Sequence, residues 1–139
     1  MKVKKWKEDL NIITPLEYII FKDVPMKSSS HGEIIDTDIH ELELMAAKAL
    51  IEMGVPLRGR ELSFLRKVMG LSYEKFAGPL GLSAATIMHW EKSKNDRLHE
   101  INEVGVRAYL AELLDLKIEG KFSSLLGNKK TTKIEIKAS

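Results

Sequence analysis

The sequence predicts a mainly helical fold: one domain of five helices with a small N-terminal β-hairpin extension. Apolar residues recur at helical spacing between residues 38 and 117, which we take as the helical domain. Glycine and serine separate these apolar segments at the positions where helices end and begin. Residues 16–24 are instead rich in β-branched and aromatic side chains, a composition typical of a strand.

The β extension is expected over residues 1–37. Its first strand would run from Leu16 to Val24, and Pro25 is expected to end it because proline cannot donate to a β ladder. A polar serine-containing loop then leads to a possible return strand at Glu33–Asp36. These two strands predict a small hairpin.

The chain is expected to finish in a basic tail, residues 118–139. Within it, polar and apolar residues alternate strictly along Thr132–Lys137, which is the pattern of a strand with one apolar and one polar face. Two interpretations remain open for this segment, a disordered end or an edge strand that pairs with the N-terminal hairpin.

The first helix is expected from Ile39 to Met53. Asp38 is a suitable N-cap with Glu41 three residues later, and Gly54 ends the helix. Its predicted inward face consists of Ile39, Leu42, Met45, Ala46, Ala49 and Leu50.

Two longer helices are expected further along the chain, at Gly59–Met69 and Glu103–Leu116. The predicted inward residues of the first are Leu62, Leu65 and Val68 or Met69, and those of the second are Val106, Leu110, Leu113 and Leu114. A polar loop, Lys94–Asn102, is expected to lead into the later helix.

Two short helices, Tyr73–Leu80 and Ala84–Ser93, are expected between these two longer helices. A tight turn at Gly81 would join them. Ser72 and Ser83 are placed to cap them. Two helices joined by such a turn are the geometry with which many proteins place one helix in the DNA major groove.

The charge distribution agrees with an anionic partner for this region. The chain has 139 residues and a net charge of only +2. However, six acidic residues and one lysine between Glu33 and Glu52 give a local charge of −5, and eight basic and four acidic residues between Arg58 and Arg97 give +4. A basic patch over the two short helices suits contact with phosphates.

The second short helix has the residues that a DNA-reading helix requires. Ile87 and Trp90 are spaced to point inward, where they would hold the helix. The small Ala84 and Ala85 allow a close approach to base edges, and His89 follows one turn later. The candidate DNA-contact residues are Ser72, Tyr73, Ser83, Ala84, Ala85, Thr86, Met88, His89, Lys92, Lys94 and Asn95.

Residues 58–93 resemble the Xre/Cro-type helix-turn-helix family, which has a lambda-repressor-like fold. The resemblance rests on Arg-Lys-Val-Met-Gly-Leu-Ser before the second helix and on Leu-Gly-Leu-Ser followed by Ile-Met-His-Trp-Glu. Over residues 14–114 the order of segments is similar to HigA/MqsA-type antitoxins of toxin–antitoxin systems. This resemblance implies a homodimer that binds operator DNA, represses its own operon and neutralises a cognate toxin.

The resemblance also assigns roles to individual residues. It implies that Tyr73 contacts DNA, although the family usually has glutamine there, and that Ala84, Ala85 and His89 face the bases. It further implies a structural ion pair between Arg66 and Glu91. Gly78-Pro79 within the expected third helix departs from the family pattern.

Other function classes are less consistent with the sequence. The histidines are scattered and no nucleophile motif lies beside them, so we expect no enzyme. Asp36, Asp38, His40 and Glu41 could suggest a metal site, but helix capping explains Asp38 and Glu41 better. The alternatives that remain are a stand-alone phage-like or metabolic repressor and a protein-interaction module without DNA binding.

The amino-acid composition also bears on location and cofactors. The chain has no cysteine, which excludes disulfides and thiolate zinc sites. No apolar run approaches the length of a membrane span, and no signal-type apolar stretch follows the basic start. We therefore expect a cytoplasmic protein with no membrane partner, no metal and no cofactor.

Overall fold

The computed structural model describes residues 3–118, 125 and 133–139. The chain divides into two compact units, one of Met1–Ala46 with Thr132–Ser139 and one of Ala47–Thr131. The described residues form five α-helices, one short 3-10 helix and a four-stranded sheet. The fold is therefore rich in helix, with more strand than the predicted hairpin.

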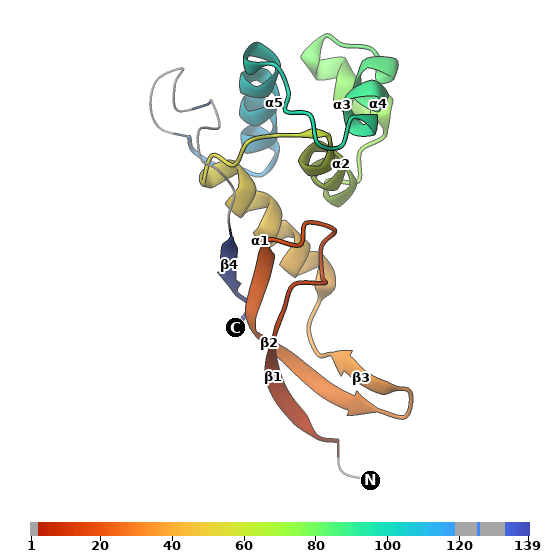
Figure 1. The fold of residues 1–139 in the computed structure, drawn as a ribbon, viewed down its shortest axis with the longest axis vertical. Helices are drawn as coiled ribbons and strands as arrows, with labels where there is room; N and C mark the ends of the chain where they lie inside the picture. The colour runs from red at the N-terminus through yellow and green to blue at the C-terminus, as the bar shows by residue number, and fades with distance from the viewer. Residues whose placement is uncertain (1–2, 119–124, 126–132) are drawn as a thin grey trace. The chain divides into compact units, whose positions relative to one another are not determined.

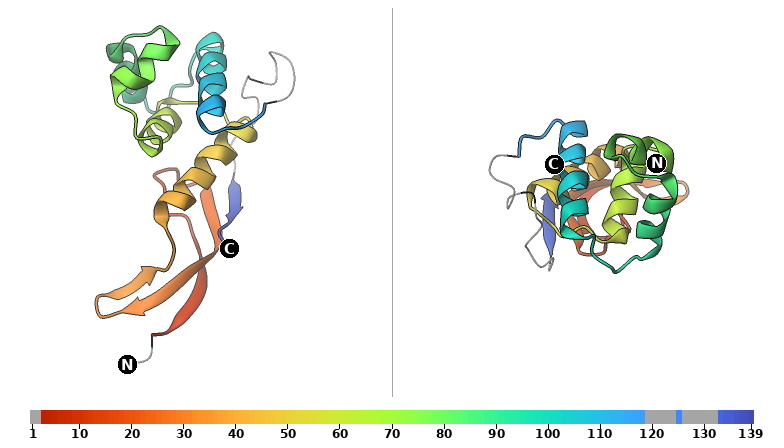
Figure 2. Two further views of the ribbon diagram at one scale, coloured as in Figure 1. Left: turned by 180° about the vertical axis from the view of Figure 1, so that it is seen from behind. Right: turned by 90° about the horizontal axis from the view of Figure 1, so that it is seen from above.

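The sheet of the first unit is built around one long strand (Figure 1). β1 (Lys5–Leu10) and β3 (Gly32–Ile35) each pair antiparallel with β2 (Ile19–Ser29). β4 (Ile134–Lys137) pairs parallel with the first residues of β2, as Figure 2 also shows. The edge-strand interpretation is therefore confirmed for Ile134–Lys137, while residues 119–124 and 126–132 of the expected tail lie outside the described residues.

β1 was not predicted from the sequence. Its residues alternate between exposed and half-buried, but its two lysines, glutamate and aspartate leave little apolar content. Strand propensity depends mainly on packing against neighbours, and β1 lies along β2, with Lys5 opposite Lys27 and Trp6 opposite Met26. The local sequence alone does not indicate this pairing.

The prediction that Pro25 ends the strand expected at Leu16–Val24 is wrong, because β2 continues through Pro25 to Ser29. The ring nitrogen and the carbonyl of Pro25 both face the β3 side of β2. There the carbonyl accepts from the backbone N–H of Asp36 at 2.7 Å, just beyond the last residue of β3. The missing donor thus coincides with the end of the β2–β3 ladder, where proline is tolerated.

A bulge in β2 sets which side chains reach the core of the first unit. Asp23 has a positive φ of 56°, and the β1–β2 register shifts between Glu8 and Leu10. Since the extra residue reverses the alternation, Phe21 and Val24 are both buried although they lie three residues apart. The core residues of this unit are Leu16, Ile19, Phe21, Val24, Met26, Leu42, Ala46 and Ile134.

α1 (Ile39–Glu52) begins at the predicted residue and ends one residue before the predicted Met53. The Asp38 carboxylate accepts from the backbone N–H of His40 at 2.9 Å, and Gly54 follows the helix with a φ of +65°. The expected inward face is wrong at Ile39 and Met45, which are 46% and 36% exposed. The buried residues are Leu42, Ala46, Ala47, Leu50 and Ile51, a stripe rotated away from Met45.

The helical unit contains α2 (Gly59–Val68), α3 (Tyr73–Ala77), η1 (Gly78–Leu80), α4 (Ala84–Lys92) and α5 (Glu100–Leu113). Figure 1 shows α3 and α4 side by side, with α2 next to α4. The core of the helical unit includes Leu57, Leu62, Leu65, Phe76, Ile87, Val106 and Leu110. Edge-to-face packing of Phe76 on Tyr109, with ring centroids 5.8 Å apart, joins α3 to α5.

Two predicted helices need correction. The third ends at Ala77 instead of Leu80, and residues 78–80 form a 3-10 turn, because Pro79 lacks the N–H that a continued α-helix would use. The fifth begins at Glu100, within the expected loop, and its C-cap is Leu114. Leu113, expected inward, is 40% exposed, whereas Leu114 is buried.

Candidate nucleic-acid interface

The turn between α3 and α4 is fixed by backbone bonds and by a helix cap. Gly81 has a φ of +69°, and its N–H donates to the carbonyl of Gly78 at 3.0 Å. The Ser83 hydroxyl accepts from the backbone N–H of Thr86 at 3.2 Å and lies 2.9 Å from the Thr86 hydroxyl. The start of α4 thus has a defined direction relative to α3.

A buried ion pair ties α4 to α2. Arg66 donates from Nε to Oε2 of Glu91 at 2.6 Å and from Nη2 to Oε1 at 3.0 Å, and both side chains are buried. The hydrogen bond to Glu91 is the main reason that the pKa of Arg66 is raised. The pair expected from the sequence is therefore formed, in the bidentate geometry that arginine favours.

Arg66 also contacts the segment that leads into α3. Its Nη1 donates to the carbonyl of Leu71 at 2.9 Å, and its guanidinium carbon lies 4.1 Å from the centre of the Tyr73 ring. This cation–π contact positions Tyr73, which is half-buried and retains an exposed part beside α4. Tyr73 is thus held by the residue that also holds Glu91.

The loop after α4 is docked on the N-terminus of α2. The N–H groups of Gly59 and Arg60 donate to the carbonyls of Asp96 and Lys94, at 3.2 and 3.1 Å. A Cβ atom at Gly59 would collide with the carbonyl of Trp90 and would lie 2.6 Å from that of Ser93. The close approach therefore requires glycine.

A buried carboxylate, which the sequence analysis missed, holds the same loop from α5. Oε1 of Glu103 accepts from the N–H of Leu57 at 2.6 Å, and Oε2 accepts from Nη2 of Arg97 at 2.8 Å. Glu103 is fully buried. Glu103 lies in the first turn of α5, because that helix begins three residues before the predicted start at Glu103.

Arg107, one turn further along α5, was also missed. Its Nη2 donates to the carbonyl of Val55 at 2.6 Å and its Nε to that of Leu125 at 2.8 Å, while Nη2 lies 3.5 Å from Glu103. Burial lowers the pKa of Arg107, and the nearby Glu103 carboxylate opposes this effect. This buried cation satisfies backbone carbonyls and therefore has a structural role.

The outer face of α4 is free of these contacts. Ile87 and Glu91 are buried, whereas Ala85, Met88, His89 and Lys92 are exposed. These four positions lie at i, i+3, i+4 and i+7, so they form one face of the helix. Beside it is a shallow groove of about 350 Å³, lined by Ser63, Lys67, Tyr73, Met88, His89, Glu91 and Lys92.

The structure brings most of the candidate contact residues together on α3, α4 and the loop that follows. Exposed among them are Ser72, Ser83, Ala85, Met88, His89, Lys92, Lys94 and Asn95, and partly exposed are Tyr73, Ala84 and Thr86. Two further groove residues, Ser63 and Lys67 on α2, were not among the candidate contact residues. Ser63 and Lys67 are four residues apart, which places them on the same face of α2, and this spacing can be read from the sequence.

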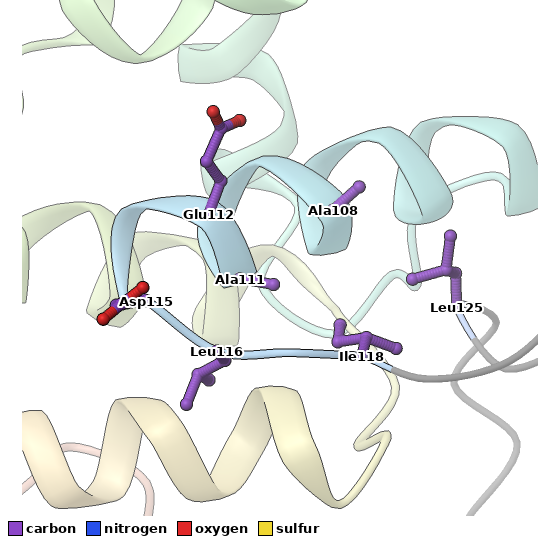
Figure 3. A pocket seen from close by; sticks show the side chains of 7 residues that line it. All are labelled: Ala108, Ala111, Glu112, Asp115, Leu116, Ile118 and Leu125. Atoms are coloured by element: carbon purple, nitrogen blue, oxygen red, sulfur yellow. The ribbon is translucent and has the colours of Figure 1, made fainter.

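A second hollow, of about 430 Å³, lies along α5 (Figure 3). Its lining is apolar except for the carboxylates of Glu112 and Asp115, which would repel a phosphate backbone. The lining of the groove at α4 instead includes Lys67 and Lys92, and its one acid, Glu91, is paired with Arg66. The groove at α4 therefore suits an anionic partner better than the hollow along α5 does.

Comparison of the chain with protein-family models, with curated proteins and with solved structures finds no match. Within residues 3–118, 125 and 133–139, no three metal-ligating side chains gather into a site. In the same part of the chain, no helix is both long enough and apolar enough to span a membrane.

Proposed function

We propose that this chain is a sequence-specific DNA-binding transcriptional regulator and that α4 enters the major groove. One observation carries the proposal. α4 is held on its inner side by Ile87 and by the bidentate Arg66–Glu91 pair, while its outer side is exposed and begins with small residues. A helix that reads bases requires this combination of rigid support and a free face.

The fold proposed for the helical unit is a lambda-repressor-like helix-turn-helix domain of the Xre/Cro type. In this interpretation α3 and α4 are the two helices of the motif, and α2 and α5 support them. The order of the elements, the turn at Gly81 and the Arg66–Glu91 pair support it.

The charges around α4 suit a phosphate backbone. Lys67, Lys75, Lys92 and Lys94 are exposed near the groove or on the neighbouring elements, against the exposed acids Glu74 and Asp96. Lysines on both sides of the reading helix would contact phosphates and fix the register of the protein on the duplex.

The proposed regulator acts as a homodimer on a two-fold operator with half-sites roughly one helical turn apart, about 34 Å. The narrower expectation of an antitoxin that represses its own operon and neutralises a cognate toxin stays a prediction. Copurification of the product of a neighbouring gene with this chain would support that role.

A gel-shift titration with the DNA upstream of the gene for this chain tests the proposal. We expect a discrete complex that survives excess nonspecific duplex, with an affinity that falls steeply as salt is added. His89→Ala and Lys94→Ala should each weaken it several-fold, and Lys94→Ala should lower the salt slope by roughly one unit. Binding no tighter than to an unrelated duplex would contradict the proposal and favour a protein-interaction module.

A further inference from the structure

The exposed part of α4 nearest its N-terminus is mostly apolar. Met88 is 52% exposed, and Ala85 precedes it by three residues on the same face. Their outer atoms are a methyl group and a flexible thioether chain. The N-terminal turns of a reading helix are the part that contacts base edges, so these apolar groups would lie nearest the bases.

Of the polar side chains that most often read bases, α4 has only Lys92, in its last turn. α4 contains no Asn, Gln or Arg, and its one carboxylate, Glu91, is buried against Arg66. The hydroxyl of Thr86, in the first turn, is partly exposed but lies 2.9 Å from the Ser83 hydroxyl. The fully exposed hydrogen-bonding side chains, those of His89 and Lys92, lie beyond the first turn. Hydrogen-bond readout from the first turns of α4 is therefore limited.

The surroundings of Met88 suit a polyanion better than an apolar protein partner. Lys67, Lys92 and His89 line the same groove, and Glu91, the acid that lines it, is already paired. An apolar protein surface would leave Lys67 and Lys92 without charged partners, whereas a DNA groove places phosphates on both sides of the bases.

We propose, on the basis of the function proposed above, that Met88 with Ala85 recognises thymine C5-methyl groups in the major groove. Thymine has the one methyl group that the four bases present on that edge. Met88 is then the specificity-determining residue, Lys67 and Lys92 contact the flanking phosphates, and the preferred half-site contains thymine opposite the first two turns of α4. The flexible Met side chain adapts its contact to the methyl position.

Replacement of thymine by deoxyuridine tests this inference, because it removes the methyl group and leaves every hydrogen-bonding atom in place. Duplexes are first enriched from a random synthetic pool with the full chain, and each thymidine of the best duplex is then replaced in turn. We expect one or two positions per half-site at which binding weakens about fourfold, which corresponds to roughly 0.8 kcal/mol for one buried methyl group.

A matched pair of variants assigns the effect to Met88. Met88→Leu keeps an apolar side chain and should retain the preference for thymine over deoxyuridine. Met88→Gln has similar length but is polar, and it should bind both duplexes equally at the position that Met88 contacts, whereas a preference that comes from Ala85 should remain at its own position. The position is exposed, so both variants should melt within a few degrees of the parent.

The outcomes separate the two proposals. Equal binding of thymine and deoxyuridine duplexes by the parent chain, or a preference that Met88→Gln retains at every position, overturns methyl recognition by Met88 while DNA binding stands. If no duplex is enriched from the pool, the proposed function itself fails and the inference fails with it.

Discussion

At the scale of single residues, the strongest constraint on the candidate interface is the contact between Arg66 and Glu91. Each carboxylate oxygen of Glu91 accepts one bond from Arg66, at 2.6 and 3.0 Å. Arg66 also contacts the Leu71 carbonyl and the Tyr73 ring. One guanidinium therefore positions α4, the segment before α3 and a residue of the groove.

Loss of the Glu91 carboxylate should destabilise the helical unit. Glu91→Ala leaves the Arg66 charge buried without its anionic partner, and we expect a fall of roughly 3 kcal/mol in the free energy of unfolding. Urea titration followed by circular dichroism measures it. Lys92→Ala, at the next and exposed position of α4, is the control and should change stability by less than about 0.5 kcal/mol. Equal stability of both variants would show that the pair has no structural role.

Asp9 gives a prediction on pH for the sheet. Its carboxylate lies 2.8 Å from Nζ of Lys22, and this contact, with the N–H of Asp23, lowers the pKa of Asp9 below its ordinary value of 3.8. The contribution of Asp9 to stability is therefore present above pH 3.8 and is lost as pH falls through the lower pKa of the folded state.

An NMR titration of the Asp9 carboxyl carbon checks this directly, and the midpoint should lie below 3.8. In the Lys22→Met variant the midpoint should move upward, because the main interaction that lowers the pKa is removed. A midpoint at or above 3.8 in the parent chain would show that the Asp9–Lys22 contact does not persist in solution.

At the scale of elements, the docking of the 93–97 loop on α2 depends on Gly59. Its φ lies in the ordinary range, so the requirement for glycine comes from space and not from backbone conformation: an added Cβ meets the backbone carbonyls of Trp90 and Ser93. Those carbonyls belong to the end of α4 and the residue after it, which cannot move without disturbing the candidate interface.

Gly59→Ala should therefore destabilise the protein, by about 1–3 kcal/mol as for other overpacked sites. Gly78→Ala is the matched control, since Gly78 has helical φ and ψ and no atom lies within 4 Å of its added Cβ. That change should be neutral or slightly stabilising, because alanine has fewer unfolded conformations than glycine. Thermal melts of both variants decide the matter, and a parent-like melting temperature for Gly59→Ala would contradict the packing described.

The elements that the sequence predicted are those with their own local signals. Ser72, Ser83 and the glycines at 54, 70 and 81 mark helix ends, and the structure has caps or positive φ at these positions. The misses depend on distant partners. β1 is a strand because β2 lies beside it, and β2 continues through Pro25 because β3 stops there. Glu103 is buried because Leu57 and Arg97 reach it from elsewhere.

At the scale of the whole molecule, the two ends of the described chain belong to one sheet. β4 pairs with β2 across more than a hundred residues, from Ile19 opposite Ile134 to Lys22 opposite Lys137. The Ile134 side chain is buried in the core of the first unit, whereas Glu135 beside it is exposed. Formation of this unit therefore requires the end of the chain to return to its beginning.

Truncation of Ile134 should weaken the first unit specifically through this strand. Ile134→Ala removes a buried side chain and should lower the free energy of unfolding by about 2–4 kcal/mol, while Glu135→Ala should have little effect.

Trp6 on β1 and Trp90 on α4 are the two tryptophans. In a Trp90→Phe background the fluorescence of Trp6 therefore reports the first unit, and its unfolding midpoint in urea should fall in Ile134→Ala. An unchanged midpoint would show that β4 does not contribute to the stability of the sheet.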